Sequence, residues 1–276
     1  MGATLLGWLL LTAVLVLAVE LGYRLHRGAL DRARGKGEPD PHESGSGYVL
    51  SAALGLLGLL IAFVFSMAND RFVERRQLVV AEANAISTAV LRYQLMPEPH
   101  RSELLNSMAD YVKVRLEFYD FGADMLRVGE AEAQAEAMQA KIWRQVHAAV
   151  RTPEGAPLAM GVMMPTNEMF NLETTRRAAL EERVPARALH VLVTFAVVTA
   201  AIMGHGLAPG RRRHLVATCG LFILVAMAIS LIVDLDSPRV GSVRVPQAPM
   251  ENVAREVEAM AAEFPRASGG AASPSP

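Results

Sequence analysis

The sequence predicts an all-α polytopic membrane protein with four transmembrane helices and a helical extramembrane domain. Four apolar runs lie at residues 5–21, 48–68, 186–203 and 215–233. Each run is close to the roughly 20 residues of α-helix that cross a hydrocarbon core of about 30 Å. The segment between the second and third runs carries too many charges to enter lipid. Because a membrane segment must satisfy its backbone hydrogen bonds internally, helices are expected throughout the spans.

Composition narrows the class of protein further. The chain is 52% hydrophobic and 20% charged, which is typical of a mixed membrane protein. Its net charge is −1 and no basic stripe is interleaved with aromatic residues, so no nucleic-acid partner is expected. Only three of its 27 basic residues are lysine, which together with abundant alanine and valine indicates a GC-rich bacterium and therefore a bacterial inner membrane. The single Cys219 excludes a disulfide framework and a cysteine-based zinc site.

The first span, residues 5–21, is predicted to be an uncleaved anchor. A cleaved signal peptide is the alternative, but no basic residue precedes the apolar core and no small-x-small cleavage site follows it. Glu20 lies at the membrane edge, where it reaches headgroups or pairs with Arg24 four residues later; a buried ion or proton site is the alternative. Residues 24–47 contain five basic residues and end in a Gly- and Pro-rich linker, so a loop is expected there.

One helix is predicted to begin in the second span and to continue into the extramembrane region, because no Gly or Pro occurs between Gly58 and Pro97. Gly58, Ala62 and Ser66 repeat every four residues in its membrane part, and small residues at this spacing permit close helix packing. Heptad counting also places a seam on this helix, which serves either self-association or an intramolecular bundle. Its members are Phe65, Asn69, Phe72, Arg76, Val79, Ala83, Ile86 and Val90.

The remaining chain is divided by its prolines and glycines. Helices are expected at residues 101–122, 124–150 and 167–184, with a turn at Pro97–Pro99 and a proline-containing loop at residues 151–166. After the fourth span we expect an extended piece or strand at residues 240–245 and a weak helix at residues 250–264. The predicted parts are a first transmembrane hairpin (1–68), a helical extramembrane domain continuous with the second span (69–185), a second transmembrane hairpin (186–236) and a C-terminal segment with a disordered tail (237–276).

The segment in which the second span ends carries a family resemblance. The run FSMANDRFVERR at residues 65–76 resembles the segment where bestrophins leave the membrane, and it is followed by QLVVAEANAI at residues 77–86. These runs, together with LMPEP at residues 95–99 and DLDSPR at residues 234–239, are more similar to the bacterial bestrophin-like proteins of unknown function. The resemblance covers residues 5–244, and it implies a bestrophin-like helical fold and, if activity follows the fold, an anion channel.

The resemblance also implies candidate pore residues. Aligned on Arg71, the ring of pore-narrowing hydrophobic residues in bestrophins falls on Gly55, Leu59 and Phe63. Gly55 departs from that pattern, so one ring of the constriction is missing or wider. The alternative is that Leu59 and Phe63 face lipid or a neighbouring helix. The charged residues just beyond the span form a candidate pore mouth or, alternatively, a solvated collar. They are Asp70, Arg71, Glu74, Arg75 and Arg76.

No catalytic constellation is found in the sequence, so an enzyme is not expected. The seven histidines show no metal-binding spacing, and there is no nucleophile motif or phosphate-binding loop, so neither a metal nor a cofactor is expected. Asp234 and Asp236 are expected to anchor a helix end or to pair with arginine, with cation binding as the alternative.

Two functions remain: an oligomeric anion channel, or a membrane-anchored helical scaffold without transport activity. The expected partners are the lipid bilayer, further copies of the chain and small inorganic anions.

The sequence gives two opposite indications of the side of the membrane on which the short loops lie. One short loop, residues 24–47, carries five basic residues, and the other carries Arg211, Arg212 and Arg213. The positive-inside rule places both short loops in the cytoplasm. The bestrophin resemblance implies the reverse, with the termini and the helical domain in the cytoplasm. We favour cytoplasmic short loops.

Overall fold

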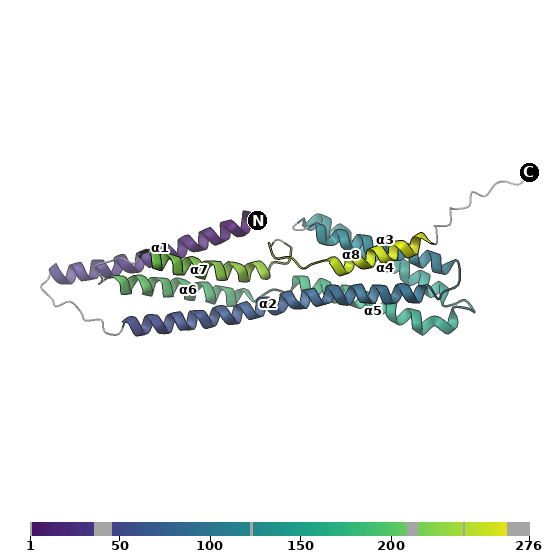
Figure 1. Cartoon of the computed structure of the whole chain (residues 1–276), viewed down its shortest axis with the longest axis horizontal. Helices are drawn as coiled ribbons and strands as arrows, with labels where there is room; N and C mark the ends of the chain where they lie inside the picture. Colours follow the sequence, from purple (N-terminus) through teal and green to yellow (C-terminus); the bar gives the residue numbers. More distant parts are fainter. Residues whose placement is uncertain (1, 36–45, 122–123, 209–214, 240, 264–276) are drawn as a thin grey trace, which may run out of the picture. The chain divides into compact units, whose positions relative to one another are not determined.

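The computed structural model describes residues 2–35, 46–121, 124–208, 215–239 and 241–263, and the regular secondary structure of these residues is helical (Figure 1). This confirms the all-α prediction. The chain forms two compact units: unit 1 contains Met1–Phe72 and Glu182–Arg244, and unit 2 contains Val73–Glu181 and Val245–Pro276. The helices are α1 (Gly2–Gly35), α2 (Ser46–Tyr93), α3 (His100–Asp120), α4 (Met125–Ala149), the 3-10 turn η1 (Ala156–Leu158), α5 (Ala159–Glu181), α6 (Ala186–Leu207), α7 (Leu215–Leu235) and α8 (Ala248–Ala262).

Four helical segments are long and apolar enough to cross a membrane, and each overlaps one of the four predicted spans. They are Leu6–Arg32, Gly47–Tyr93, Ala156–Leu207 and Val216–Leu235. The predicted continuity of the second span is also confirmed, because α2 is a single helix of 48 residues that contributes to both units. The division into membrane and extramembrane domains at the predicted boundaries stays a prediction.

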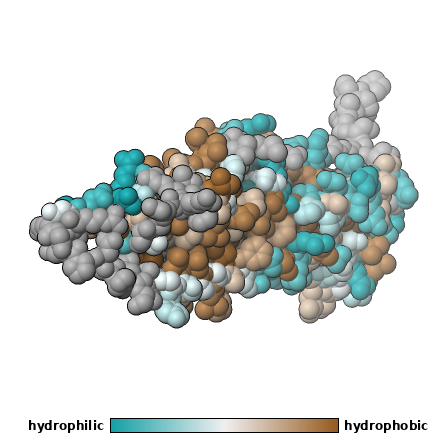
Figure 2. Space-filling model, turned by 60° about the vertical axis from the view of Figure 1, so that its left-hand side comes forward, coloured by the Kyte–Doolittle hydropathy of each residue, from teal (hydrophilic) through white to brown (hydrophobic). Residues whose placement is uncertain are grey.

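Unit 1 packs α1, α6, α7 and the first part of α2 around an apolar core. Leu15, Leu192 and Phe222 are buried there together with Leu57 and Val64 of α2. Helices α1 and α6 run parallel: Val19 of α1 lies against Gly204 of α6, and His26 lies against His205. Large apolar side chains also remain on the outside of this unit, and Figure 2 shows a broad hydrophobic area on the face in view. Such a surface is stable in lipid and unfavourable in water.

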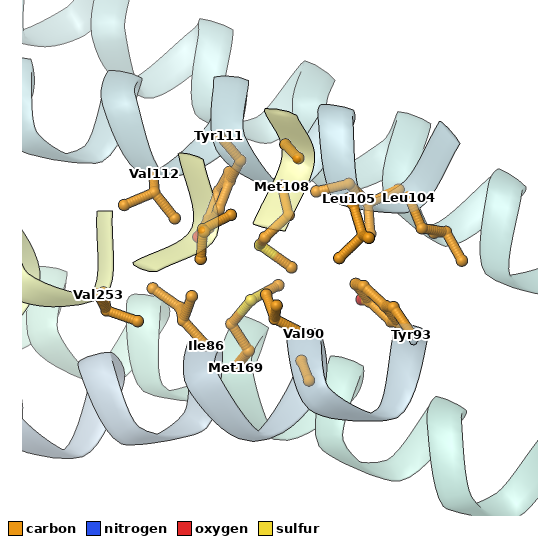
Figure 3. Packing of buried hydrophobic residues seen from close by; sticks show 14 of the residues in the cluster. Ile86, Val90, Tyr93, Leu104, Leu105, Met108, Tyr111, Val112, Met169 and Val253 are labelled. Atoms are coloured by element: carbon orange, nitrogen blue, oxygen red, sulfur yellow. The ribbon is translucent and has the colours of Figure 1, made fainter. Parts of the chain in front are cut away.

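Unit 2 packs α3, α4, α5, α8 and the second part of α2 around a separate core. Figure 3 shows Ile86 and Val90 of α2 facing Leu105 and Met108 of α3, with Met169 of α5 beside them. The seam residues Val79, Ala83, Ile86 and Val90 are buried in this core. In its second half, the heptad seam therefore closes an intramolecular bundle, which was one of its two predicted roles.

Two sequence predictions of local structure are wrong. Residues 24–35 are helical rather than a loop, because α1 continues to Gly35 through residues that favour helix and the Gly/Pro-rich composition begins only after it. Residues 159–166 belong to α5, which accommodates Pro165 inside the helix. Of the strand or extended piece predicted at residues 240–245, the strand does not form, because residues 241–245 lie outside regular secondary structure. The predicted linker at residues 36–45 and the tail beyond residue 263 lie outside the described residues.

Close contact between α1 and α6 gives the first testable prediction. A Cβ added to Gly204 would overlap the carbonyl oxygen of Val19, whereas a Cβ on Gly206 would meet nothing within 4 Å. We expect Gly204→Ala to lower the stability of the detergent-solubilised protein by about 1–3 kcal/mol, as overpacking does. Gly206→Ala is the matched control and should be neutral or slightly stabilising, because alanine favours helix. Equal thermal unfolding midpoints for the two variants would contradict this packing.

Candidate functional site

The predicted pore residues lie together on one exposed face of α2. Gly55, Leu59 and Phe63 follow one another at four-residue spacing, which places them on the same side of a helix. Leu59 is 51% exposed and Phe63 is 61% exposed, whereas Leu57 and Val64 on the opposite side are buried in the core of unit 1. The face is thus left uncovered by the described part of the chain. One helix face encloses no channel, so a pore would require several copies.

A second set of small residues lies next to this face. Gly58, Ala62 and Ser66 are exposed, and a Cβ added to Gly58 would meet nothing within 4 Å. By helical periodicity these residues alternate with Gly55, Leu59 and Phe63 along a single broad stripe. The small-residue ridge that the sequence suggests for close helix packing is therefore not used for packing within the described chain.

The predicted mouth residues have different environments. Arg71 forms an ion pair with Glu182. Arg75 is 2% exposed, and its Nε donates a hydrogen bond of 3.0 Å to the carbonyl oxygen of Ala179. Asp70, Glu74 and Arg76 are exposed. Arg75 therefore holds α2 against α5, whereas Arg76 presents a positive charge to solvent.

Unit 2 contains a buried ionic network that sequence reasoning did not find. The carboxylate of Glu82 on α2 accepts hydrogen bonds from Nε of Arg115 at 2.8 Å and from a terminal nitrogen of Arg176 at 2.5 Å. Arg115 also donates to Glu173 at 3.2 Å, and Arg176 donates to the side chain of Gln247 at 2.5 Å. The network connects α2, α3 and α5 to the residue that precedes α8. All four charged side chains are buried.

The balance of charges keeps Glu82 ionised. Burial alone would raise its pKa, but the guanidinium groups of Arg115 and Arg176 outweigh that effect and hold the pKa of Glu82 below its ordinary value. Burial raises the pKa of Tyr119 to about 12, and its ring lies 3.8 Å from the guanidinium carbon of Arg176. With two arginines and two glutamates in contact, the network is saturated and acts as a structural anchor. Its only signal in the sequence is Glu82, an acidic residue within the apolar run QLVVAEANAI.

The carboxylates that the sequence singles out elsewhere anchor helix ends. Asp234 accepts hydrogen bonds from the backbone nitrogens of Ser242 at 2.7 Å and Val243 at 3.0 Å. Asp236 accepts one from the backbone nitrogen of Val184 at 2.8 Å. The helix-end prediction for this pair is confirmed. Glu20 pairs with Arg24, with 2.7 Å between Oε1 and Nε, as i,i+4 spacing predicts.

Comparison with known proteins identifies the fold. A family model described as "Bestrophin-like domain" matches residues 10–250, and no curated protein matches the chain. A bacterial bestrophin homologue from Klebsiella pneumoniae is similar in structure, with a TM-score of 0.64 at 14% identity over 91% of this chain and 98% of that one. A single-residue variant of a homologue from the same organism gives a TM-score of 0.69 at 14% identity, over 95% and 99%. At 14% identity the structural similarity to these homologues shows the fold of this chain.

The buried network predicts a large effect of a small substitution. Glu82→Gln keeps the shape of the side chain but leaves Arg176 without its carboxylate partner, so we expect a loss of about 3–5 kcal/mol of stability. Glu117→Gln, at an exposed position on α3, is the matched control and should change the stability little. Thermal unfolding of the purified protein in detergent at pH 7 measures both.

A comparison of wild type with Glu82→Gln at different pH values gives a second test, with a defined sign. Because the fold lowers the pKa of Glu82 from its ordinary value of 4.5, its contribution to stability is present above that value and is lost as the pH falls through the folded-state pKa. The stability difference between wild type and Glu82→Gln should therefore shrink below pH 4.5. A difference that stays constant down to the acid unfolding of the protein would refute the charge assignment.

Proposed function

The chain belongs to the bestrophin-like domain family, and on this premise we propose that it assembles into an oligomeric anion channel in a bacterial inner membrane. The observation that carries the proposal is the exposed face of α2 formed by Gly55, Leu59 and Phe63. Helices that face only a core bury their apolar stripe, whereas α2 has a buried stripe in unit 1 and a second apolar stripe on its outside. A second stripe is suited to a pore or to a neighbouring subunit.

Assembly of several copies would turn this face into a constriction. Leu59 and Phe63 from copies arranged around an axis form successive apolar rings, and an apolar ring of small diameter resists hydrated ions by dewetting. At the level of Gly55 there is no side chain to narrow the path. The proposal therefore places the constriction at Leu59 and Phe63 and a wider segment at Gly55.

The neighbouring small residues support the contact between copies. Gly58, Ala62 and Ser66 let another helix approach closely, and in lipid such approach is stabilised by van der Waals packing rather than by the hydrophobic effect. Because these residues share the stripe with Leu59 and Phe63, one copy of α2 can contact its neighbour and line the path at the same time.

Charge further along α2 gives a basis for selectivity. Arg76 is exposed, and a ring of such arginines raises the local concentration of anions. Exposed Asp70 and Glu74 on the same helix oppose this effect, so the preference for anions is expected to be moderate. It should also weaken with salt, since the screening length is about 10 Å at 0.1 M ionic strength.

The constriction predicts a gain of function. In proteoliposomes we expect Leu59→Ala combined with Phe63→Ala to raise chloride flux severalfold, because truncated rings lower the barrier to hydrated ions. Leu10→Ala combined with Leu17→Ala removes two exposed leucines from α1 and is the matched control, with flux expected at the wild-type level.

Two outcomes would contradict the proposal. A mass of 29.8 kDa for the detergent-solubilised protein, that of one chain, would reject assembly. Equal impermeability of the wild type and the double variant, in a folded oligomer, would reject the pore. The second outcome would leave the membrane-anchored helical scaffold as the function.

The arginine at the proposed mouth predicts a change in selectivity. Arg76→Glu reverses an exposed charge, so the reversal potential under a potassium chloride gradient should shift towards potassium, with the shift fading at high salt. Arg144→Glu reverses an exposed charge on α4 and should leave the reversal potential unchanged. Identical reversal potentials for wild type and Arg76→Glu at low salt would remove Arg76 from the ion path.

A further inference from the structure

Unit 2 contains a polar cavity that has no part in the proposed pore. It lies between α3 and α4, has a volume of about 310 Å³, and seven of its eight lining residues are polar or charged. This volume is at the lower end of the range for small-molecule sites, about 300–1,000 Å³. Glu103, Ser107 and Asp110 line it from one face of α3, and Lys141 and Gln145 line it from one face of α4.

One buried polar atom in the wall has no hydrogen-bond partner among the described residues. It is Oε1 of Gln145, which accepts no hydrogen bond. A buried polar group without a partner is unfavourable by about 1–3 kcal/mol. Gln145 and the largely buried Ser107, which is 2% exposed, both line the cavity, so a molecule inside it can form hydrogen bonds with both side chains.

The two walls carry opposite charges that do not neutralise each other. Glu103 and Asp110 provide carboxylates from α3, and Lys141 provides an ammonium group from α4. Within the described residues Lys141 forms neither an ion pair nor a hydrogen bond, so neither carboxylate lies within 4 Å of its nitrogen. The space between them is the cavity itself.

From this arrangement we propose that the cavity binds a small zwitterion that bears both an ammonium and a carboxylate group, such as a small neutral amino acid. The ammonium group of the ligand lies at Asp110, Glu103 and the Oε1 of Gln145. Its carboxylate accepts from the Lys141 ammonium and the Ser107 hydroxyl.

The lining distinguishes this ligand class from the others. A simple cation would face Lys141, and a simple anion would face two carboxylates, so each would be repelled by one wall. Pro99 is the one apolar residue in the lining, so a ligand with a large apolar side chain gains little there. Glycine, alanine, serine and glutamine are the amino acids that fit this description.

The test is direct binding to the purified full chain in detergent. Isothermal titration with glycine, L-alanine, L-serine and L-glutamine should show saturable binding of at least one of them at millimolar concentration or below. Ethanolamine, which lacks the carboxylate, and propionate, which lacks the ammonium group, should bind at least tenfold more weakly. Lys141→Gln and Asp110→Asn should each weaken binding about tenfold or more, the effect of one lost charge-assisted hydrogen bond. Arg144→Gln, an equal loss of charge one turn along α4, should leave it unchanged.

Two results would overturn the proposal. One is no saturable heat from any of the four amino acids, which would mean that the cavity holds water only. The other is binding that Lys141→Gln leaves intact, which would place the ligand elsewhere; Lys141 is exposed, so this variant retains the fold. Because binding is measured without ion flux, failure here and failure of the channel are separate results.

Discussion

The carboxylate of Glu82 is buried among helices, and it is stable there because Arg115 and Arg176 both reach it. An ionised group in such surroundings is strongly unfavourable without partners, and the same holds for each guanidinium. The network is therefore stable only when all members are present. Since Glu82 and the arginines come from three helices, this condition fixes the register of α2 against α3 and α5. The apolar core of unit 2 alone, with interchangeable aliphatic side chains, specifies register less strictly.

Helix α2 has two different environments along its length. In unit 2 its buried face is completed by the chain's own helices, with Ile86 and Val90 in the core. In unit 1 it buries Leu57 and Val64 and leaves an apolar face with Leu59 and Phe63 outside. Lipid tolerates such a face, but the interleaved small residues Gly58 and Ala62 suit a close helix neighbour better than lipid chains. This combination supports α2 as the lining of the proposed pore over α1, which also exposes large apolar side chains.

Sequence reasoning succeeded where one chemical property decides the structure. Hydropathy located the four spans, and the absence of Gly and Pro between Gly58 and Pro97 predicted that the second span continues without a break into the extramembrane region. It failed where charge was taken as evidence of a loop, as in the C-terminal part of α1, and where Pro165 was taken as a helix breaker. The buried network could not be predicted, since Arg176 lies 94 residues from Glu82 and no periodicity connects them. The candidate pore residues came from a family resemblance: Leu56 is as exposed as Leu59, and spacing alone does not separate them.

We propose that copies of this chain conduct anions, and electrical recording from purified protein in planar bilayers is the most direct test. We expect discrete current steps under a chloride gradient, with a reversal potential displaced towards that of chloride. Absence of current from protein that is folded and oligomeric in the same membranes would contradict it.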